Sequence, residues 1–484
     1  MKTIALIWLR HDLRLHDNPA LQAALAAGQT PVPVYIHDDT QSDWPLGAAS
    51  AWWLHHSLTA LHADLRRHGS DLLIFRGEPL AQLTHIAQTL GAASVHWNRS
   101  YEPLLSARDN TVEHGLRAIG VSVHSHLGNL LREPSQLLKQ DGTPYRVFTP
   151  FWKNLQKVGV TPPAGHCPAR LPAIPNTTLA RLTPAQLALL PQIPWDKEFS
   201  GHWQPGEAGA HAAVERLCAD ALLDYAQDRD RPDLPGTSRL SAHLHFGEVS
   251  PRQLWRHVHD WAASATARAA LAAAEAFLRQ LVWRDFARQL LLHFPHTANE
   301  PLDARFNAMP WRTDYAAELR RWQQGQTGIP IVDAGMRELW TTGWMHNRVR
   351  MIVASLLTKN LLIPWQEGAR WFWDTLVDAD LANNSMGWQW VAGCGADAAP
   401  YFRVFNPVLQ GQRFDPDGAY VRRWVPELKL LPVKWLHQPW LAPSAVLENA
   451  HLQLGTEYPR PIVDLAESRE RALEVWDGVK LQLR

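Results

Sequence analysis

Tryptophan is concentrated in one part of this chain of 484 residues. Nine of its 24 tryptophans fall between Trp311 and Trp390, and the run ends in Gly387-Trp388-Gln389-Trp390. An indole offers a large apolar surface, one N–H donor and a flat face on which a nucleobase or a flavin can stack. It is also easily oxidised by one electron. The block therefore predicts buried core, a stacking site, an electron-transfer path, or a mixture of the three.

Polar residues of particular types are interleaved with these indoles. In a helix, Asn347, Arg350 and Met351 would share one face, with Arg348 one step around it. An amide and a methionine beside arginines suit the recognition of an uncharged polar ring flanked by phosphates. A solvated basic face with one buried methionine is the alternative interpretation.

Two carboxylates and two amides follow at short spacing, in Asp378-Ala379-Asp380 and Asn383-Asn384. Aspartates arranged in this way bind a metal ion, or accept hydrogen bonds from sugar hydroxyls or ring N–H groups. A metal is the weaker interpretation, because no further carboxylate or histidine nearby completes a ligand set. We therefore expect no metal site.

Two earlier segments place polar and aromatic residues at helical positions. Thr237-Ser238-Arg239-Leu240-Ser241 follows a Pro-Gly breaker and begins a helical run, where hydroxyls, an arginine and the helix dipole would favour a phosphate. An N-cap with spare hydroxyls is the simpler interpretation of that motif alone. Gln280, Trp283 and Arg284 would share one helix face, either as a costly buried polar set or as an exposed face anchored by one indole.

The N-terminal and C-terminal parts of the chain have different patterns. Brief β-rich apolar runs alternate with helical runs near the N-terminus, which predicts right-handed β-α-β crossovers and a parallel sheet. No GxGxxG follows the first run. Prolines are frequent between about residues 133 and 205, and the pattern beyond about Gly209 is helical. We predict an α/β domain over residues 1–132, a linker over 133–207 and an all-helical domain over 208–484. The strand-like runs are Ile4–Leu9, Pro33–His37, Leu72–Arg76 and Ser94–Trp97.

The composition limits the location and the partners of the protein. Lys+Arg and Asp+Glu are equal at 47 each, so a polyanion would have to meet a local basic patch. Three scattered cysteines exclude a disulfide scaffold and fit a reducing compartment. The apolar run Ile4–Leu9 is followed at once by Arg10-His11-Asp12, which is too short and too quickly charged for a signal peptide or a membrane span. We expect a cytoplasmic monomer with no membrane partner.

Several long motifs in the chain match one known family. GWMHNRVRM, DADLANN, GWQW and DAAPYFRVFNP lie between Gly343 and Pro407, Trp8–Arg14 is followed by Asp17-Asn18, and Tyr225 precedes Thr237–Ser241 by twelve residues. With these motifs the chain resembles the DNA photolyase/cryptochrome family, and most of all the bacterial cyclobutane pyrimidine dimer photolyases. The resemblance implies an α/β N-terminal domain, a long linker and a helical domain that holds FAD. It also favours the phosphate interpretation of Thr237–Ser241.

The resemblance assigns flavin-binding roles residue by residue. Asn384 matches the asparagine that faces the reactive flavin nitrogen. The other residues divide between the phosphates and the rest of the cofactor. Those expected at the phosphates are Tyr225, Thr237, Ser238, Arg239, Leu240, Ser241 and Arg284, and those expected at the middle and ring portions are Asn347, Arg350, Asp378 and Asp380.

A second group matches positions that touch damaged DNA. Trp283 and Trp390 match the indoles that flank a flipped-out pyrimidine dimer, and Gln280, Asn347, Arg348 and Met351 complete that pocket. Arg229, Arg348 and Arg403 match positions near the DNA backbone, which would give a neutral protein a local basic rim. Trp388, Trp365 and Trp311 match the inner, middle and outer members of an electron path to the flavin, with Trp371, Trp373 or Trp340 as another exit.

The implied activity is light-driven repair of cyclobutane pyrimidine dimers in UV-damaged DNA, by electron transfer from excited, reduced FAD. Gln280 departs from the pattern, because enzymes of this kind usually carry a glutamate there and an amide cannot supply a proton in the same way. A blue-light photoreceptor with weak or no repair is therefore the main alternative. A photolyase of 6-4 photoproducts is less favoured, since Asn347 and Met351 stand where those enzymes place histidines.

The antenna site also departs from one branch of the family. That branch holds a folate with an Asn-Glu pair, and this chain has Leu104 and Leu105 at the matching positions. A folate antenna is therefore disfavoured. A deazaflavin, a flavin or no antenna at all remain open.

Overall fold

The computed structural model describes residues 3–40, 42–265, 269–398 and 402–482. Its internal contacts divide the chain into two compact units. Unit 1 comprises the chain up to Leu223 together with Ser238–His293, and unit 2 comprises Asp224–Thr237 together with the chain from Phe294 onward. The two units are described separately.

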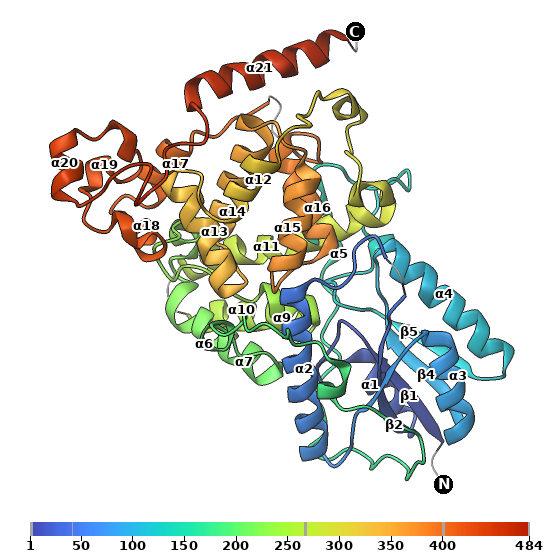
Figure 1. Cartoon of the computed structure of the whole chain (residues 1–484). Helices are drawn as coiled ribbons and strands as arrows, with labels where there is room; N and C mark the ends of the chain where they lie inside the picture. The colour runs from blue at the N-terminus through green and yellow to red at the C-terminus, as the bar shows by residue number, and fades with distance from the viewer. Residues whose placement is uncertain (1–2, 41, 266–268, 399–401, 483–484) are drawn as a thin grey trace. The chain divides into compact units, whose positions relative to one another are not determined.

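Unit 1 contains a five-stranded sheet in which every pairing is parallel, in the order β3-β2-β1-β4-β5 (Figure 1). This confirms the predicted parallel sheet. The fifth strand was not predicted, because its sequence Ser-Val-His-Ser-His is polar and lies at the edge of the sheet, where one apolar residue is enough. The strands are β1 (Ile4–Leu9), β2 (Thr30–His37), β3 (Leu73–Arg76), β4 (Ala92–Asn98) and β5 (Ser122–His126).

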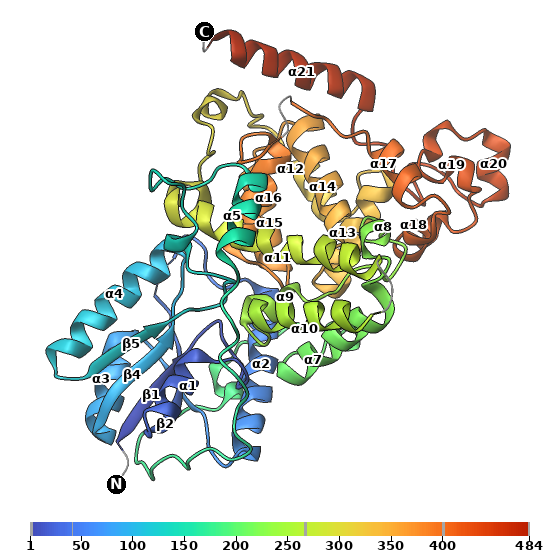
Figure 2. The same cartoon turned by 180° about the vertical axis from the view of Figure 1, so that it is seen from behind.

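Four helices connect these strands: α1 (Pro19–Ala26), α2 (Ala48–Arg67), α3 (Pro79–Leu90) and α4 (Pro103–Ala118). In both views α3 and α4 lie together on one side of the sheet and α2 lies on the other (Figures 1 and 2). Leu83 and Ile86 of α3 and Val112 and Leu116 of α4 are fully buried in one core cluster with Trp8 and its neighbours on the sheet. The apolar periodicity of the helices and the apolar strands therefore meet in a single core.

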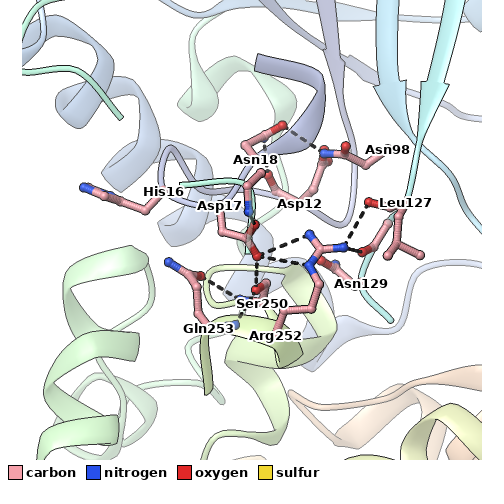
Figure 3. Close-up of polar contacts among 12 residues, drawn as sticks. Asp12, His16, Asp17, Asn18, Asn98, Leu127, Asn129, Ser250, Arg252 and Gln253 are labelled. Carbon is pink, nitrogen blue, oxygen red and sulfur yellow. Dashed lines mark hydrogen bonds and ion pairs between the residues drawn. The ribbon is translucent and has the colours of Figure 1, made fainter. Parts of the chain in front are cut away.

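The loop after β1 is bonded to helices from the later part of the chain, all within unit 1 (Figure 3). The Asp17 carboxylate is buried and accepts hydrogen bonds from the Ser250 hydroxyl and from the Arg252 guanidinium, the latter at 3.2 and 3.3 Å. Arg14 donates to the Gly247 carbonyl at 2.8 Å. Because an unpaired buried charge is expensive, these bonds hold the loop firmly against that segment.

The remaining helices of unit 1 are α5 (Phe148–Val158), α6 (Phe199–His202), α7 (Glu207–Arg216), α9 (Ser241–Phe246), α10 (Pro251–Ser264) and α11 (Ala269–His293). The compact division therefore groups α9–α11 with the sheet, whereas the boundary drawn from the sequence at residue 208 places them with the later helices. The Ala- and Leu-rich sequence Ala269–His293 forms α11, and residues 266–268 lie outside the described part of the chain.

Unit 2 is helical, and its described residues contain no strand beyond one isolated bridge between Leu454 and Tyr458. Gly343, in a left-handed conformation with φ 68°, ends α13 and separates it from α14. The helices are α8 (Tyr225–Asp228), α12 (Ala316–Gln323), α13 (Pro330–Thr342), α14 (Asn347–Ser355), α15 (Trp365–Thr375), α16 (Leu381–Ala392), α17 (Pro407–Phe414), α18 (Ala419–Trp424), α19 (Val433–Leu436), α20 (Ser444–Asn449) and α21 (Leu465–Gln482).

None of the helices in the described ranges has both the length and the apolar composition that a membrane crossing requires.

Candidate functional site

The first turn of α14 is fixed by bonds from several directions. The His346 side chain caps the helix, accepting a hydrogen bond from the Arg348 backbone N–H at 3.2 Å. Arg350 donates to the Met345 carbonyl at 2.8 Å, and its guanidinium pairs with both oxygens of Asp378, at 2.9 and 3.1 Å. Two of the predicted site residues, Arg350 and Asp378, therefore form a partly buried ion pair.

The open side of α14 carries the other predicted residues. Asn347 is exposed, and Met351 and Arg348 are half-buried. Helical spacing thus places an amide, a thioether and a guanidinium at the accessible surface of unit 2. Their neighbours Val349 and Ile352 are buried and anchor the helix in the core.

The start of α16 presents a second polar set. Asp380 caps the helix by accepting from the backbone N–H of Asn383 at 3.0 Å and from its side-chain amide at 2.7 Å. The Asn384 amide nitrogen donates to the Ala369 carbonyl of α15 at 2.9 Å. That bond fixes which way the Asn384 amide points and uses one of its two N–H groups, so the second N–H and the carbonyl oxygen remain for other partners.

The described residues hold no group of three or more His, Cys, Asp or Glu side chains placed to bind a metal ion. The partners found for Asp378 and Asp380 explain this: one is neutralised by Arg350 and the other caps a helix. The carboxylate pair Asp378-Ala379-Asp380 serves hydrogen bonding in unit 2.

The tryptophans of the block fall into distinct environments. Trp388 is buried on α16, and its indole N–H has no hydrogen-bond partner among the described residues. Trp365 is buried at the start of α15, and Trp311 is half-buried. Trp322 is fully buried and donates to the Val353 carbonyl at 3.0 Å, which is the environment of a core residue.

Two other indoles of the block form an exposed stack. Trp340 of α13 and Trp371 of α15 lie nearly parallel, with ring centroids 6.0 Å apart and planes 7° apart. Trp340 is 52% exposed.

Trp390 is half-buried and donates its indole N–H to the Asp397 carbonyl at 3.0 Å.

The predicted DNA-contacting arginines of unit 2 lie beside aromatic rings or an acid. Arg348 donates to a carboxylate oxygen of Asp230 at 2.7 Å. Arg229 follows α8, with its guanidinium 5.8 Å from the ring of the buried Tyr225. Burial raises the pKa of the Tyr225 hydroxyl, which stays a neutral hydrogen-bonding group. Arg403 is exposed and lies 4.9 Å from the Phe405 ring. In the motif that contains Arg403, residues 399–401 lie outside the described part of the chain.

In unit 1 the predicted residues of α11 have specific partners. Gln280 is half-buried and its amide nitrogen donates to the Ala276 carbonyl of its own helix at 3.2 Å. Trp283 is half-buried, and the Phe148 ring stacks on one of its faces with a centroid distance of 3.7 Å and a 5° tilt. Only the other face of this indole is left for a ligand.

Arg284 and Asp285 are buried against the backbone that follows β5. Arg284 donates to the carbonyls of Asn129 at 2.6 Å and Leu244 at 2.9 Å. Asp285 accepts from the Leu131 backbone N–H at 2.7 Å. Burial raises the pKa of the Asp285 carboxyl to about 6, although the neighbouring Arg284 opposes the shift. The sequence did not single out Phe148 or Asp285.

Thr237–Ser241 spans the boundary between the units, with Thr237 in unit 2 and the other four residues in unit 1. Within unit 1, Ser238 accepts from the Leu240 backbone N–H at 3.3 Å, and Ser241 opens α9. Arg239 has a left-handed backbone, φ 52°, and its guanidinium lies 4.7 Å from the Trp203 ring. Leu240 is buried. The motif leads into α9, but Leu240 stands at the N-cap position and no side chain caps the helix, so the simpler N-cap interpretation was wrong. The phosphate role of the motif stays a prediction.

A recess lies at the carboxyl ends of β1 and β4 in unit 1. Strand order reverses between these two strands, which is where open α/β sheets bind ligands. The recess is open to solvent and small, with about 30 Å³ of room for the centres of water-sized molecules. Leu105 contributes to its wall, while Leu104 is 60% exposed. Other lining residues are His11, Asp12, Arg99, Tyr101, Asn129 and Arg288.

Comparisons with known proteins agree with this arrangement. Residues 5–172 match the family model of DNA photolyase, and residues 277–478 match that of the FAD binding domain of DNA photolyase. The chain is 46% identical to a deoxyribodipyrimidine photo-lyase of Agrobacterium fabrum over 98% of both proteins. It is 38% identical to cryptochrome-2 of Arabidopsis thaliana, over 97% of this chain and 78% of that protein.

Solved structures give the same result. A bacterial class III photolyase from Agrobacterium tumefaciens superposes with a TM-score of 0.94 at 45% identity, covering 99% of this chain and 98% of that one. A cryptochrome of Synechocystis superposes with a TM-score of 0.90 at 32% identity, covering 98% and 99%. With its parallel sheet, its helical FAD-binding domain and these similarities over almost its whole length, the chain belongs to the DNA photolyase/cryptochrome family.

Proposed function

We propose that this protein repairs cyclobutane pyrimidine dimers in UV-damaged DNA, in a light-driven reaction that uses bound, reduced FAD. The observation that carries the proposal is that α14 has both a polar residue fixed by an ion pair and polar residues that remain accessible. Arg350 is tied to Asp378, while Asn347 and Met351 remain accessible on the same helix. One face thus offers a fixed polar group for a cofactor and free amide and thioether groups for a lesion.

The residues present fit FAD. Within unit 2, Asn384 and the Arg350–Asp378 pair are polar groups fixed by the protein, in a largely buried setting. The indole N–H of Trp388 is buried without a partner among the described residues, a condition that a static apolar core usually avoids. FAD, when bound, supplies the light-driven electron. Asn384, Arg350, Asp378 and Asp380 would hold it, and Trp388, Trp365 and Trp311 would carry electrons to it.

On the DNA side, the chain offers stacking surfaces and cations. The free face of Trp283 and the half-buried Trp390 can each stack against a base. Arg229, Arg348 and Arg403 can neutralise phosphates, which gives affinity without reading sequence. A damaged base pair is already weakly stacked, so flipping it out costs less than flipping a normal pair.

A blue-light photoreceptor with weak repair is the second candidate, and one observation favours it. The Gln280 amide nitrogen donates one N–H to its own helix, which leaves its second N–H and its carbonyl oxygen for other partners. A neutral amide can donate a hydrogen bond but has no acidic proton to give, so the position supplies no proton to a lesion. The similarity to plant cryptochromes is consistent with this alternative.

Blue-light repair of two short oligonucleotides tests the proposal. One carries a cyclobutane dimer and the other a 6-4 product, and each is incubated with the chemically reduced protein in light and in darkness. Light-dependent loss of the cyclobutane dimer alone is the expected result. Turnover of neither substrate, with normal photoreduction, would favour the photoreceptor, and turnover of the 6-4 product alone would overturn the substrate assignment.

We propose that any antenna pigment is a deazaflavin or a flavin. Leu105 brings an aliphatic wall to the recess of unit 1, and no amide–carboxylate pair stands at Leu104 and Leu105 to hold a folate. The absorption spectrum of pigment released from the purified protein would identify it.

We further propose that the protein acts as a cytoplasmic monomer, in keeping with its three unpaired cysteines.

A further inference from the structure

We propose that Asp230 is a built-in competitor of DNA: its carboxylate occupies the two arginines Arg229 and Arg348 and thereby lowers the affinity of the protein for DNA. The inference rests on the proposed function, in which these arginines contact the DNA backbone. It adds a residue of opposite charge that sets how strongly they do so.

The carboxylate of Asp230 lies between the two cations. One oxygen accepts a hydrogen bond from Arg348 Nη2 at 2.7 Å, and the other lies 3.9 Å from Arg229 Nε. All three side chains are between a fifth and a third exposed, so they lie at the surface where DNA would arrive. Each oxygen of one acid therefore faces one predicted phosphate ligand.

The Arg348 guanidinium has little freedom to serve two anions. Its Cζ lies 4.5 Å from the Phe414 ring, so one face of the group is covered. Its Nε is buried and has no hydrogen-bond partner among the described residues, which leaves the outer N–H groups as the accessible donors. Nη2 is one of these, and Asp230 already holds it. A phosphate that used the same donor would meet the carboxylate as a like charge.

The neighbouring acid of the same loop has a different partner. Asp233 binds Arg231, with N–O distances of 2.8 and 2.5 Å, and its side chain is almost fully buried. Asp233 therefore neutralises its own arginine and leaves Asp230 as the acid bonded to Arg348. Within the described part of unit 2, the charge of Asp230 is thus directed at the predicted DNA contacts.

The exposure of the pair decides what it can do. Partly exposed ion pairs are weak and are screened by salt, so DNA can displace Asp230 and is not blocked by it. Asp230 therefore reduces the free energy of DNA binding, because a DNA phosphate must displace its carboxylate before the phosphate can pair with the arginines. Losing one ion pair of this partly exposed kind corresponds to about a fivefold change in the dissociation constant for DNA.

The test compares D230N, D230E and D477N with the parent protein, all with bound FAD. Asparagine keeps the size of the side chain and removes the charge, and glutamate keeps the charge. Asp477 pairs with Lys480 on α21 at 2.5 Å and contacts neither arginine, so D477N is matched in net charge. Binding of a fluorescent duplex, with and without a cyclobutane dimer, is measured by anisotropy over a range of salt concentrations.

We expect D230N to bind both duplexes about fivefold more tightly at low salt. The slope of log affinity against log salt concentration should steepen by up to about the amount that one additional phosphate contact gives. D230E and D477N should bind like the parent. In an R348A background, D230N should lose most of its effect, because the partner is gone.

The outcomes separate the inference from the proposed function. If the parent binds DNA but D230N binds equally or less tightly, with normal FAD absorbance and melting temperature, the inference is wrong and the proposed function stands. If D477N gains as much as D230N, net charge is responsible and the inference is again wrong. If the parent binds neither duplex, both the inference and the proposed function fail.

Discussion

The indole of Trp388 lies directly against the backbone of Gly368. A Cβ atom on Gly368 would lie 2.0 Å from Cη2 of Trp388, and the next nearest atoms, at 2.5 Å, belong to the same ring. No side chain fits into that space, so glycine is required there. The contact fixes the predicted inner electron carrier on α16 against α15, the helix that begins with Trp365.

This contact leads to a paired prediction on two glycines. Gly368→Ala should displace the Trp388 ring and destabilise the protein by about 1–3 kcal/mol, as overpacking of a core usually does. Gly387→Ala is the matched control, since Gly387 is also helical and a Cβ there meets nothing within 4 Å. The control should be neutral or stabilising by about 0.4–1 kcal/mol. Thermal melting and the rate of flavin photoreduction check both; equal behaviour of the two variants would contradict the packing argument.

Trp388→Phe should abolish photoreduction of bound FAD by an external reductant. Phenylalanine keeps most of the apolar volume but is much harder to oxidise, so it removes the electron step and keeps the fold. The rate of FAD reduction is measured from the flavin absorbance while the protein is illuminated in the presence of a thiol reductant. Photoreduction at the parent rate would show that Trp388 is not the inner carrier.

Trp322→Phe provides the control for that experiment. Trp322 touches Trp388, with ring centroids 6.2 Å apart, but its N–H is bound to the Val353 carbonyl. Its replacement should cost about 1–3 kcal/mol, because the indole's hydrogen bond is lost and the smaller ring leaves a cavity, while photoreduction persists; the Val353 carbonyl keeps the Leu356 backbone N–H as a donor. A loss of photoreduction in both variants would point to disturbed packing in place of a lost electron carrier.

The strands were predictable to the extent that they are buried. Ile4–Leu9 was predicted at its observed bounds because a short apolar run that alternates with helical segments is typical of a buried parallel strand. The edge strand Ser122–His126 is polar and gave no such signal. One helix was overlooked in spite of a signal: Phe148, Phe151, Trp152 and Leu155 recur at helical spacing inside the predicted linker, and all four are buried in α5.

The site was predictable within helices but not between segments. Spacing alone placed Asn347, Arg350 and Met351 on α14, and the family motif supplied their roles. The partner of each polar group was beyond reach, because Arg350 finds Asp378 and Arg284 finds the Asn129 carbonyl only after folding. Charge type indicates that a partner is needed, and tertiary structure decides which one it takes.

Asp285 should make stability depend on pH. The pKa of its carboxyl is about 6 in the folded protein, above its ordinary value of 3.8, because burial disfavours the charged form. The folded state therefore binds more protons between these values. The stabilisation is complete below about pH 3.8 and is lost as the pH rises through about 6, with a total effect on the order of 3 kcal/mol.

Asp285→Asn tests this dependence. The amide oxygen can still accept from the Leu131 N–H, and the variant carries no titrating charge. We expect it to melt at a higher temperature than the parent at pH 8 and at a similar temperature near pH 4.5. A variant that is less stable than the parent at pH 8 would mean that attraction to Arg284 outweighs the cost of burying the charge.

Gln280→Glu should increase repair of the cyclobutane dimer while leaving photoreduction unchanged. A carboxylate cannot donate to the Ala276 carbonyl as the Gln280 amide does, so the side chain would leave its own helix and become available to a lesion. A protonated glutamate there could supply a proton or a charged hydrogen bond, and positioned groups of this kind commonly contribute about 10²-fold or more. We expect a gain of about tenfold in repair per absorbed photon, falling as the pH rises above the glutamate pKa. Gln324→Glu, at an exposed position, adds the same charge and should change nothing. If Gln280→Glu repairs no better than the parent, and the parent itself repairs poorly, the limit lies elsewhere and the photoreceptor becomes the better description of this protein.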